Sequence, residues 1–320
     1  MRVLAPSLGL AALMSSVAFA ADIQTRQISF ENAGATLVGT LYLPTDHEPG
    51  ESHPGVVVTG AWTSVKEQMS GLYAREMASR GFTALAFDFR GWGSSGGHIR
   101  FKEDPAAKTS DIVAAASFMT TLPEVDGSAV FGLSICASAG YMTAAATGNT
   151  AFDGIVLVAP WLHNAAIVEE VYGGGAGVAA LIATSRQAEL SEQAGQPQVI
   201  TAASATDRDA LMYQVPYYTE ENRGLVPEYD NRFNLASWEP WLIYDSVALA
   251  IGLDKPLLLV HSNAAAVPQG ARQFLENVEG MADELWLDDI TQFEFYDRPD
   301  VVEIAADAAS RHFSGIRAGR

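Results

Sequence analysis

The lone cysteine of this chain, Cys136, lies where an apolar run gives way abruptly to small residues. The stretch Ser128–Met142 reads SAVFGLSICASAGYM, and alanine-rich sequence typical of a helix continues beyond it. The pattern predicts a strand that turns sharply into a helix, because small residues allow two backbones to approach each other closely. A side chain at such a turn is held at the helix N-terminus, where backbone N–H groups stabilise a developing negative charge. The position therefore suits a nucleophile.

Three registers of this turn are compatible with the sequence. Cys136, Ser134 or Ser138 can each stand at the tip, with small residues two positions away on either side. A strand of the usual length, about five or six residues, that follows the turn at 126–127 ends before Cys136. Ser134 would leave a rather short strand, and Ser138 would require the strand to run through Ala137. We therefore expect Cys136 at the tip, although a buried cysteine that only packs in the turn has the same signature.

Five motifs along the chain carry a family resemblance. They are GAWTSVKEQM (60–69), FDFRGWGSSGG (87–97), ICASAGY (135–141), APWLH (159–163) and FYDRP (295–299). With them the chain resembles α/β-hydrolases of the dienelactone-hydrolase-related branch, in which cysteine replaces serine at the nucleophile elbow G-x-S-x-G. The resemblance implies an α/β-hydrolase fold over nearly the whole mature chain and says much less about the substrate. It also implies a catalytic acid after the seventh strand and a histidine after the eighth.

Strand and helix patterns alternate along most of the chain. The expected strands are 24–31, 36–43, 55–59, 83–88, 128–135, 154–159, 256–261 and 284–287. The first two form an antiparallel hairpin, and helices are expected after Pro105, Cys136, Pro268 and Pro299 and after a capping box that begins at Ser64. This alternation predicts a mostly parallel central sheet with helices on both faces.

Regular alternation is lost between residues 161 and 255, a segment far longer than an ordinary connection. Its composition fits a mostly helical lid inserted after the sixth strand. Its many aromatic residues can line a substrate pocket, although most of them are expected to pack the lid against the body. We therefore divide the chain into a core, residues 21–160 and 256–320, and a lid, residues 161–255.

A conventional catalytic triad is not visible at the positions that the resemblance implies. Asn263 follows the seventh strand where an acid is expected, and Gln292 follows the eighth where a histidine is expected. Neither amide takes a proton at neutral pH. His163, just past the sixth strand, is the best alternative base, and His98 and His261 are weaker candidates.

Two alternatives remain open if no histidine serves as the base. In the first, the helix N-terminus favours the thiolate of Cys136 without a dedicated base, while Gln292 and Asn263 bind substrate or orient water. In the second, catalysis has been lost and the pocket only binds a ligand.

The sequence provides both backbone donors that an oxyanion hole needs. The Ala137 N–H directly follows the nucleophile, and the N–H of Ala61 or Trp62, in the loop after the third strand, is the natural second donor. Trp62 also offers a wall to a substrate pocket. The D-x-R-G-x-G turn at 88–93 is expected to be structural, with its charged side chains satisfying backbone groups.

The N-terminus has the composition of a secretory signal peptide. Arg2 precedes an apolar run too short to span a bilayer, and residues 18–20 form an A-x-A cleavage site. We therefore expect residues 1–20 to be removed and the mature protein to be periplasmic or secreted.

A single cysteine excludes internal disulfides, and a net charge of −19 argues against nucleic acid and anionic membranes as partners. No spacing of His, Cys and carboxylate residues indicates a metal, and no cofactor is expected.

These observations together predict an enzyme that cleaves or transfers an acyl group. The bond would be an ester, lactone or thioester, and the intermediate an acyl group on Cys136. The partner would be a small molecule with an acyl or carbonyl group. The alternatives are a Ser134-dependent esterase and a ligand-binding protein without catalysis. The sequence predicts neither the particular substrate nor the oligomeric state.

Overall fold

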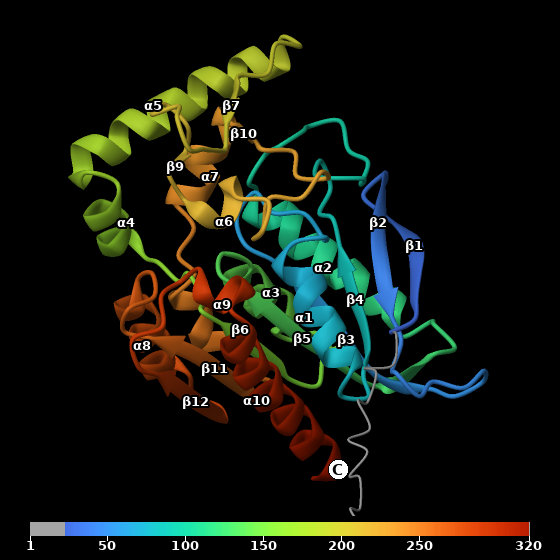
Figure 1. Cartoon of the computed structure of the whole chain (residues 1–320). Coiled ribbons are helices and arrows are strands. Elements are labelled where there is room, and N and C mark those ends of the chain that lie inside the picture. The colour runs from blue at the N-terminus through green and yellow to red at the C-terminus, as the bar shows by residue number, and fades with distance from the viewer. Residues whose placement is uncertain (1–22, 320) are drawn as a thin grey trace, which may run out of the picture.

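An eight-stranded, mostly parallel sheet forms the centre of the molecule (Figure 1). The computed structural model describes residues 23–319. The strand order is β1-β2-β4-β3-β5-β6-β11-β12; β1–β2 and β2–β4 pair antiparallel and the other pairs are parallel. The strands are β1 (Thr25–Asn32), β2 (Ala35–Tyr42), β3 (His53–Thr59), β4 (Thr83–Phe87), β5 (Val125–Ile135), β6 (Ile155–Val158), β11 (Leu257–Ser262) and β12 (Ala282–Leu287). The predicted fold class, an α/β-hydrolase sheet, is confirmed.

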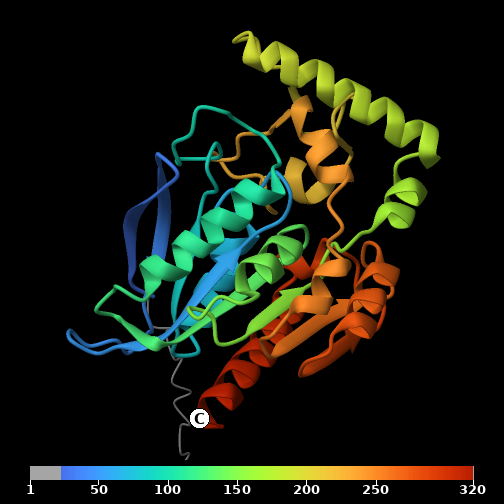
Figure 2. The ribbon, with the colours of Figure 1, turned by 180° about the vertical axis from the view of Figure 1, so that it is seen from behind.

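Helices cover both faces of this sheet. α1 (Met69–Ala78) and α10 (Pro299–Ala318) lie on one face, whereas α2 (Pro105–Met119) and α3 (Ser138–Ala146) lie on the other (Figures 1 and 2). Two further helices, α8 (Pro268–Asn277) and α9 (Glu294–Asp297), follow β11 and β12 in the sequence. Because both faces are covered, the central strands are continuous buried apolar runs.

Helix α2 starts as predicted, whereas α1 does not. Asp104 caps α2 by accepting a hydrogen bond from the Ala107 N–H at 3.0 Å. The predicted capping box is wrong, because α1 begins only at Met69. The Ser64 hydroxyl instead donates to the Ala61 carbonyl at 2.7 Å, within the turn that follows β3.

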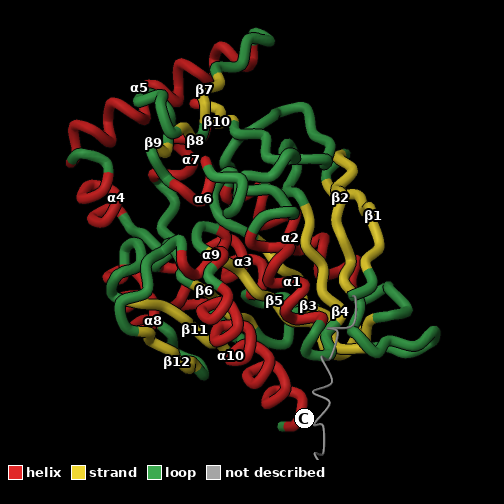
Figure 3. Tube along the Cα trace, in the orientation of Figure 1, coloured by secondary structure: helices red, strands yellow, loops and turns green. Residues whose placement is uncertain are grey.

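The segment between β6 and β11 extends beyond the carboxyl ends of the parallel strands (Figures 1 and 3). It contains α4 (Ala165–Val171), α5 (Gly174–Gln193), α6 (Pro216–Thr219), α7 (Trp238–Leu242), the 3-10 helices Leu235–Ser237 and Ala248–Gly252, and the short strands β7 (Val199–Thr201), β8 (Ala203–Ser204), β9 (Met212–Tyr213) and β10 (Arg232–Asn234). The long helix α5 crosses the top of the molecule in Figure 1, and its buried residues are Ser185 and Ala188. That this segment works as a lid stays a prediction.

Within residues 23–319 no individual helix has the length and apolar composition to cross a membrane; only α4 and α5 taken together, bent by 92°, meet that criterion. The predicted signal peptide lies outside the described residues.

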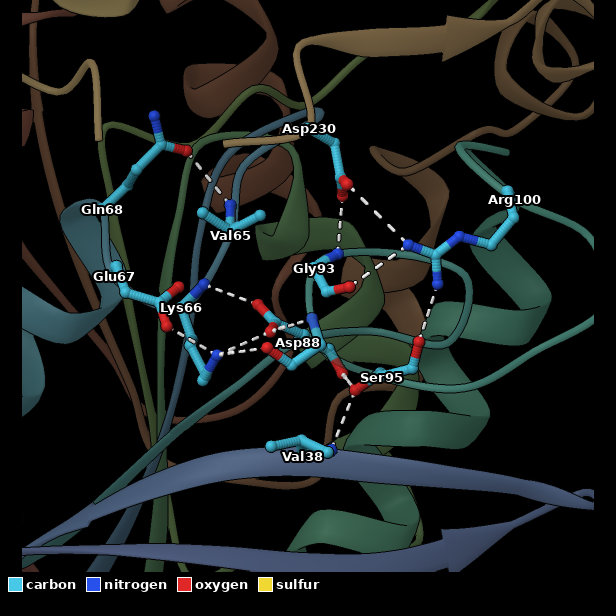
Figure 4. Close-up of polar contacts among 11 residues, drawn as sticks. Val38, Val65, Lys66, Glu67, Gln68, Asp88, Gly93, Ser95, Arg100 and Asp230 are labelled. Atoms are coloured by element: carbon cyan, nitrogen blue, oxygen red, sulfur yellow. Dashed lines mark hydrogen bonds and ion pairs between the residues drawn. The ribbon is translucent and has the colours of Figure 1, made fainter. Parts of the chain in front are cut away.

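The buried carboxylate of Asp88 organises the loop that follows β4 (Figure 4). It accepts hydrogen bonds from the Lys66 backbone N–H at 2.7 Å, the Lys66 ammonium at 2.8 Å and the Ser94 N–H at 2.9 Å. Asp230, from the inserted segment, accepts from the Gly93 N–H at 2.6 Å. The Asp88 side chain leaves no room for a Cβ at Gly93. As expected, this turn is structural: Asp88 and Asp230 satisfy backbone donors, although Arg90 pairs with the Asp111 carboxylate at 2.6 Å.

A second buried ion pair connects the start of α2 to the inserted segment. The Lys108 ammonium lies 2.6 Å from both carboxylate oxygens of Glu103, and both side chains are shielded from solvent. The Glu103 N–H donates to the Ser237 hydroxyl at 2.8 Å, and Tyr141 of α3 donates to the Glu103 carboxylate at 3.4 Å. Burial raises the pKa of Glu103 and lowers the pKa of Lys108, while each charge opposes the shift of its partner.

Candidate active site

Cys136 stands at the tip of the predicted turn, between β5 and α3. Its φ of 60° lies in the left-handed region, which costs a residue other than glycine about 1–3 kcal/mol. The Cys136 carbonyl accepts hydrogen bonds from the Ala139 N–H at 3.1 Å and the Trp161 N–H at 3.0 Å. Its own N–H donates to the Val158 carbonyl at 3.1 Å. These bonds hold the strained residue in the geometry of a nucleophile elbow.

Small residues flank the turn because α3 packs closely against β5 and also against the inserted segment. A Cβ at Gly132 would collide with the Met142 side chain, and a Cβ at Gly140 would lie 2.9 Å from both Tyr244 and Ser246. This packing explains the small-residue pattern from which the elbow was predicted.

Neither serine alternative stands at the tip. Ser134 is fully buried within β5, and its hydroxyl has no hydrogen-bond partner in the described part of the chain. Ser138 begins α3, where its hydroxyl donates to the Ile135 carbonyl at 3.1 Å and accepts from Thr59 at 3.0 Å. The expectation that Ser134 could replace Cys136 as the nucleophile is therefore wrong on geometry, because its hydroxyl is sealed inside the sheet.

Three hydrogen-bond donors are directed at the Cys136 sulfur, namely the N–H groups of Ala137 and Trp62 and the Tyr296 hydroxyl, and the Gln292 amide lies beside them. Burial raises the pKa of the Cys136 thiol, and these groups, which favour the thiolate, only moderate that effect. The thiol is therefore protonated at neutral pH. The two backbone donors come from different loops, which is the arrangement of an oxyanion hole.

Of the two candidates for the second backbone donor, Trp62 rather than Ala61 faces the sulfur. The Ala61 N–H points to the Met69 sulfur at 3.5 Å, whereas the Trp62 N–H is directed at Cys136. The Trp62 ring packs against Trp241, with ring centroids 4.8 Å apart, and forms part of the wall of the cavity above the sulfur.

This cavity has a volume of about 730 Å³ and lies between the carboxyl edge of the sheet and the inserted segment. Its walls are mainly aromatic and aliphatic, and include Trp62, Trp161, Tyr172, Leu181, Leu211, Tyr218, Trp238 and Trp241. Among the lining residues, Asp209 carries the one formal charge, and it is exposed at the rim. The cavity therefore suits a largely apolar small molecule.

His163 does not line this cavity, which corrects the prediction that it serves as the base. Its ring is buried and packs edge-on against Trp241, with centroids 4.5 Å apart. Its Nδ1 accepts a hydrogen bond from the Trp161 indole at 3.1 Å, because an indole nitrogen can only donate. Its Nε2 therefore carries the ring proton and donates it to the Trp241 carbonyl at 3.1 Å. With both nitrogens engaged, His163 has no lone pair for a thiol proton.

The buried ring of His163 makes stability depend on pH. Burial lowers the pKa of His163 to about 4, whereas an unfolded chain has the ordinary value of about 6.5. Between about pH 4 and 6.5 the imidazole is protonated in the unfolded chain but neutral in the folded chain. The free energy of unfolding therefore decreases as pH falls from about 6.5 to 4. The loss should reach about 3 kcal/mol for this residue. Urea unfolding at several pH values should show a shallower decline in His163→Gln than in the wild type, and an unchanged slope would contradict this assignment.

The two amides at the triad positions differ in location. Asn263 is exposed and does not line the cavity, and its side-chain oxygen accepts a hydrogen bond from Arg272 at 2.9 Å, so it is not placed to bind substrate or orient water there. Gln292 lines the cavity, and its amide donates to the Ala159 carbonyl at 2.9 Å and to the Tyr296 hydroxyl at 3.1 Å.

The two weaker histidine candidates also lie away from the cavity. His98 is exposed and His261 is buried within β11, and neither lines the cavity.

Tyr296 is the site residue that the sequence did not reveal. It is buried in α9, accepts a hydrogen bond from Gln292 and donates its own proton to the Cys136 sulfur. Burial raises the pKa of Tyr296 well above its ordinary value, so the hydroxyl stays protonated and acts only as a donor. Its motif, FYDRP, is part of the family resemblance, but a tyrosine in a motif is equally compatible with packing.

Known proteins similar in sequence include uncharacterized proteins, a polyketide transferase and a thiohydrolase. The chain is 28% identical to the uncharacterized protein PA2218 of Pseudomonas aeruginosa over 305 residues, which cover 88% of this chain and 78% of PA2218. It is 31% identical to the polyketide transferase claH of Penicillium crustosum over 129 residues, 40% of this chain and 41% of the relative. It is 38% identical to a thiohydrolase of Eupenicillium brefeldianum over 94 residues, 29% of each chain.

Solved structures and a family profile place the fold. The crystal structure of PA2218 superposes with a TM-score of 0.81 at 23% identity, covering 97% of this chain and 99% of PA2218. Dienelactone hydrolase from Anabaena variabilis superposes with a TM-score of 0.54 at 13% identity, covering 92% and 98% of the two chains. The profile of the Hydrolase_4 family, serine aminopeptidase S33, matches residues 50–217, a stretch that contains the elbow and more than half of the sequence. The chain therefore belongs to this family of α/β-hydrolases.

Proposed function

We propose that this protein transfers an apolar acyl group from a thioester to a small acceptor through an acyl-Cys136 intermediate. The observation that carries the proposal is the position of the sulfur, at a strained elbow beside the N–H groups of Trp62 and Ala137 and next to an apolar cavity. The similarity to a polyketide transferase and to a thiohydrolase supports chemistry on acyl groups.

The surroundings of the sulfur favour a thioester over an oxygen ester. No imidazole of residues 23–319 lines the cavity, and the Asp209 carboxylate lies at the rim. The thiol proton therefore has to pass to the leaving group. A thioester expels a thiolate, which is far closer in basicity to Cys136 than the alkoxide that an alkyl ester expels. Acyl transfer from a thioester to Cys136 therefore needs no dedicated base, whereas transfer from an oxygen ester does.

In the first half of the proposed reaction, the Cys136 sulfur attacks the carbonyl carbon and a new C–S bond forms. The carbonyl oxygen takes up negative charge and accepts hydrogen bonds from the Trp62 and Ala137 N–H groups. The old C–S bond then breaks, and the leaving sulfur takes the proton that Cys136 gives up. Tyr296 holds the attacking sulfur through its donated hydrogen bond.

In the second half, an acceptor attacks the acyl-Cys136 carbonyl and the thiol is restored by the proton of the acceptor. Water is a poor acceptor here, because no group beside the sulfur in the described structure can deprotonate it. An amine or a second thiol attacks without such help. We therefore expect transfer to exceed hydrolysis.

Intact-protein mass spectrometry tests the proposal directly. The chain without residues 1–20 is incubated with a medium-chain acyl thioester of N-acetylcysteamine and, separately, with the matching ethyl ester. We expect one acyl adduct on Cys136 from the thioester, a slower reaction with the ester, and faster release when an amine or thiol is added. Ser134→Ala should behave as the wild type, because the Ser134 hydroxyl has no partner to lose. The absence of any adduct, or an adduct that survives in Cys136→Ala, would refute the proposal.

Tyr296→Phe should lower the acylation rate by about 10- to 100-fold, because a hydrogen bond to a charged group contributes about 1.5–3 kcal/mol. The Tyr296 hydroxyl donates a hydrogen bond to the sulfur and favours its thiolate, so its removal raises the pKa of Cys136 further. Alkylation of Cys136 by iodoacetamide across a pH series should therefore shift to higher pH in the variant. Unchanged alkylation together with a slower reaction would mean that Tyr296 only packs against the site. Phe293→Leu, a change in a neighbouring cavity residue without a hydroxyl, is the matched control.

The same observations also favour a second function, ligand binding without catalysis. A buried, protonated thiol and the lack of a base beside it fit a site that only holds an apolar molecule. Tight binding of acyl compounds without adduct formation, equal in the wild type and in Cys136→Ala, would select this alternative.

A further inference from the structure

Three potential metal ligands meet in the loop that joins β2 to β3. His47 and Glu51 belong to this loop, and His53 is the first residue of β3. The nearest ligand atoms of the three side chains lie within 4.8 Å of one another. Because β3 leads from His53 towards Trp62, this cluster lies at the opposite end of the strand from the oxyanion hole, and the blue loop in Figure 1 is far from the inserted segment.

The two imidazoles already face each other. The His53 Nε2 and the His47 Nδ1 are 3.1 Å apart, and the Glu51 carboxylate lies 3.8 Å from the same His53 nitrogen. Two nitrogens that each bind zinc at about 2.0–2.1 Å in tetrahedral geometry are separated by about 3.3–3.4 Å. A small rotation of both rings therefore replaces the direct contact between the nitrogens with a shared cation.

The backbone of this loop is held by hydrogen bonds that do not use the ligand atoms of either imidazole. The His47 N–H donates to the Pro44 carbonyl at 3.1 Å, and the His53 N–H donates to the Glu124 carbonyl at 3.1 Å. Gly50, with φ of 96°, allows the tight bend that brings Glu51 back towards the histidines. The ligands are thus positioned before any cation arrives, which reduces the entropy lost on binding.

The surroundings add negative charge and an oxygen without a partner. His47, Glu51 and Glu124 line the same surface hollow of about 450 Å³. Oε1 of Glu124 pairs with Arg26 at 2.9 Å, whereas its Oε2 is buried and has no hydrogen-bond partner within the described structure. Such an oxygen is suited to accept a hydrogen bond from a water bound to the cation.

We propose that His47, Glu51 and His53 form a binding site for a zinc-like divalent cation. Two imidazoles and one carboxylate are typical zinc ligands, and they leave a fourth position for water. The site would connect the β2–β3 loop to the start of β3 and stabilise that end of the sheet. The sequence gives no metal prediction here, because the spacing H-x₃-E-x-H on a loop is not one of the familiar zinc patterns and only the bend at Gly50 brings the three side chains together.

Calorimetric titration of the untagged, EDTA-dialysed chain with zinc chloride tests this site. We expect one zinc ion per chain, and binding weakened by at least about 100-fold in His47→Gln and in His53→Gln, since loss of even an outer partner costs roughly 10–100-fold. Glu51→Gln should weaken binding less. His98→Gln, which changes an exposed histidine outside the cluster, should bind as the wild type does.

Two further measurements distinguish this site from non-specific binding and from misfolded variants. The cobalt(II) form should show the visible absorption of four-coordinate cobalt, and this signal should disappear in His53→Gln. Cys136→Ala should keep full zinc affinity, because the thiol lies at the other end of the sheet. Circular dichroism checks whether each variant is folded. No saturable binding by the wild type, or binding unchanged in both His47→Gln and His53→Gln, would overturn the proposal.

Discussion

Replacing Cys136 with alanine is expected to abolish the acyl adduct and to lower thioester turnover by about 10³-fold or more. The variant keeps the Trp62 and Ala137 N–H groups and the apolar cavity, so binding of the acyl compound should be nearly unchanged. Only the covalent step is lost. Single-turnover kinetics together with a binding assay separate the two effects.

Cys136→Ser provides a sharper control for this prediction. A serine hydroxyl loses its proton far less readily than a thiol, and the described residues provide no base beside the elbow to assist it. The serine variant should therefore be about as inactive as the alanine variant. Substantial activity in Cys136→Ser would show that a base reaches the elbow, and it would contradict the mechanism proposed above.

Lys108→Met is expected to destabilise the protein by about 3–5 kcal/mol, the usual cost of leaving one partner of a buried ion pair alone. The Glu103 carboxylate has no exposed surface, and the partners left to it are the Tyr141 hydroxyl at 3.4 Å and the Thr63 backbone N–H, neither of which carries a charge. Methionine fills a volume similar to that of lysine, so no cavity is created. The loss of stability therefore measures the cost of the unpaired Glu103 charge. Urea unfolding at neutral pH measures the change in the free energy of unfolding.

The double variant Glu103→Leu with Lys108→Met tests the cause of that loss. Removing both charges should recover most of the stability, because two apolar side chains often replace a buried ion pair without net cost. Arg186→Met, which breaks an exposed ion pair with Glu239, should change stability very little. A double variant that is less stable than Lys108→Met alone would show that the charges are needed for the fold itself.

The sequence was sufficient to predict the sheet and the elbow, because both depend on local patterns. Buried apolar runs such as 55–59 marked the parallel strands, and the small residues around Cys136 marked the close approach of β5 and α3. The capping box failed because a neighbouring turn after β3 uses Ser64 for its own hydrogen bond.

The side-chain partners of the site could not be predicted in the same way. His163 follows the correct strand, but two tryptophans of the inserted segment engage both of its nitrogens. Tyr296 reaches the sulfur from a short helix distant in the sequence. Both outcomes depend on the path of the long segment between β6 and β11 and of the chain after β12, where strand and helix patterns give no guidance on side-chain direction.

The glutamine after the last strand has a consequence for how this protein relates to enzymes with a histidine at that place. Codons for glutamine and histidine differ only in their third base, so a single nucleotide change at Gln292 introduces an imidazole beside the sulfur. Such a ring can keep one of the two hydrogen bonds that the amide donates to Ala159 and Tyr296 and turn its other nitrogen towards the thiol. A single nucleotide change therefore lies between thioester transfer without a base and ester hydrolysis with a histidine base. One round of random mutagenesis under selection for ester hydrolysis can make this change.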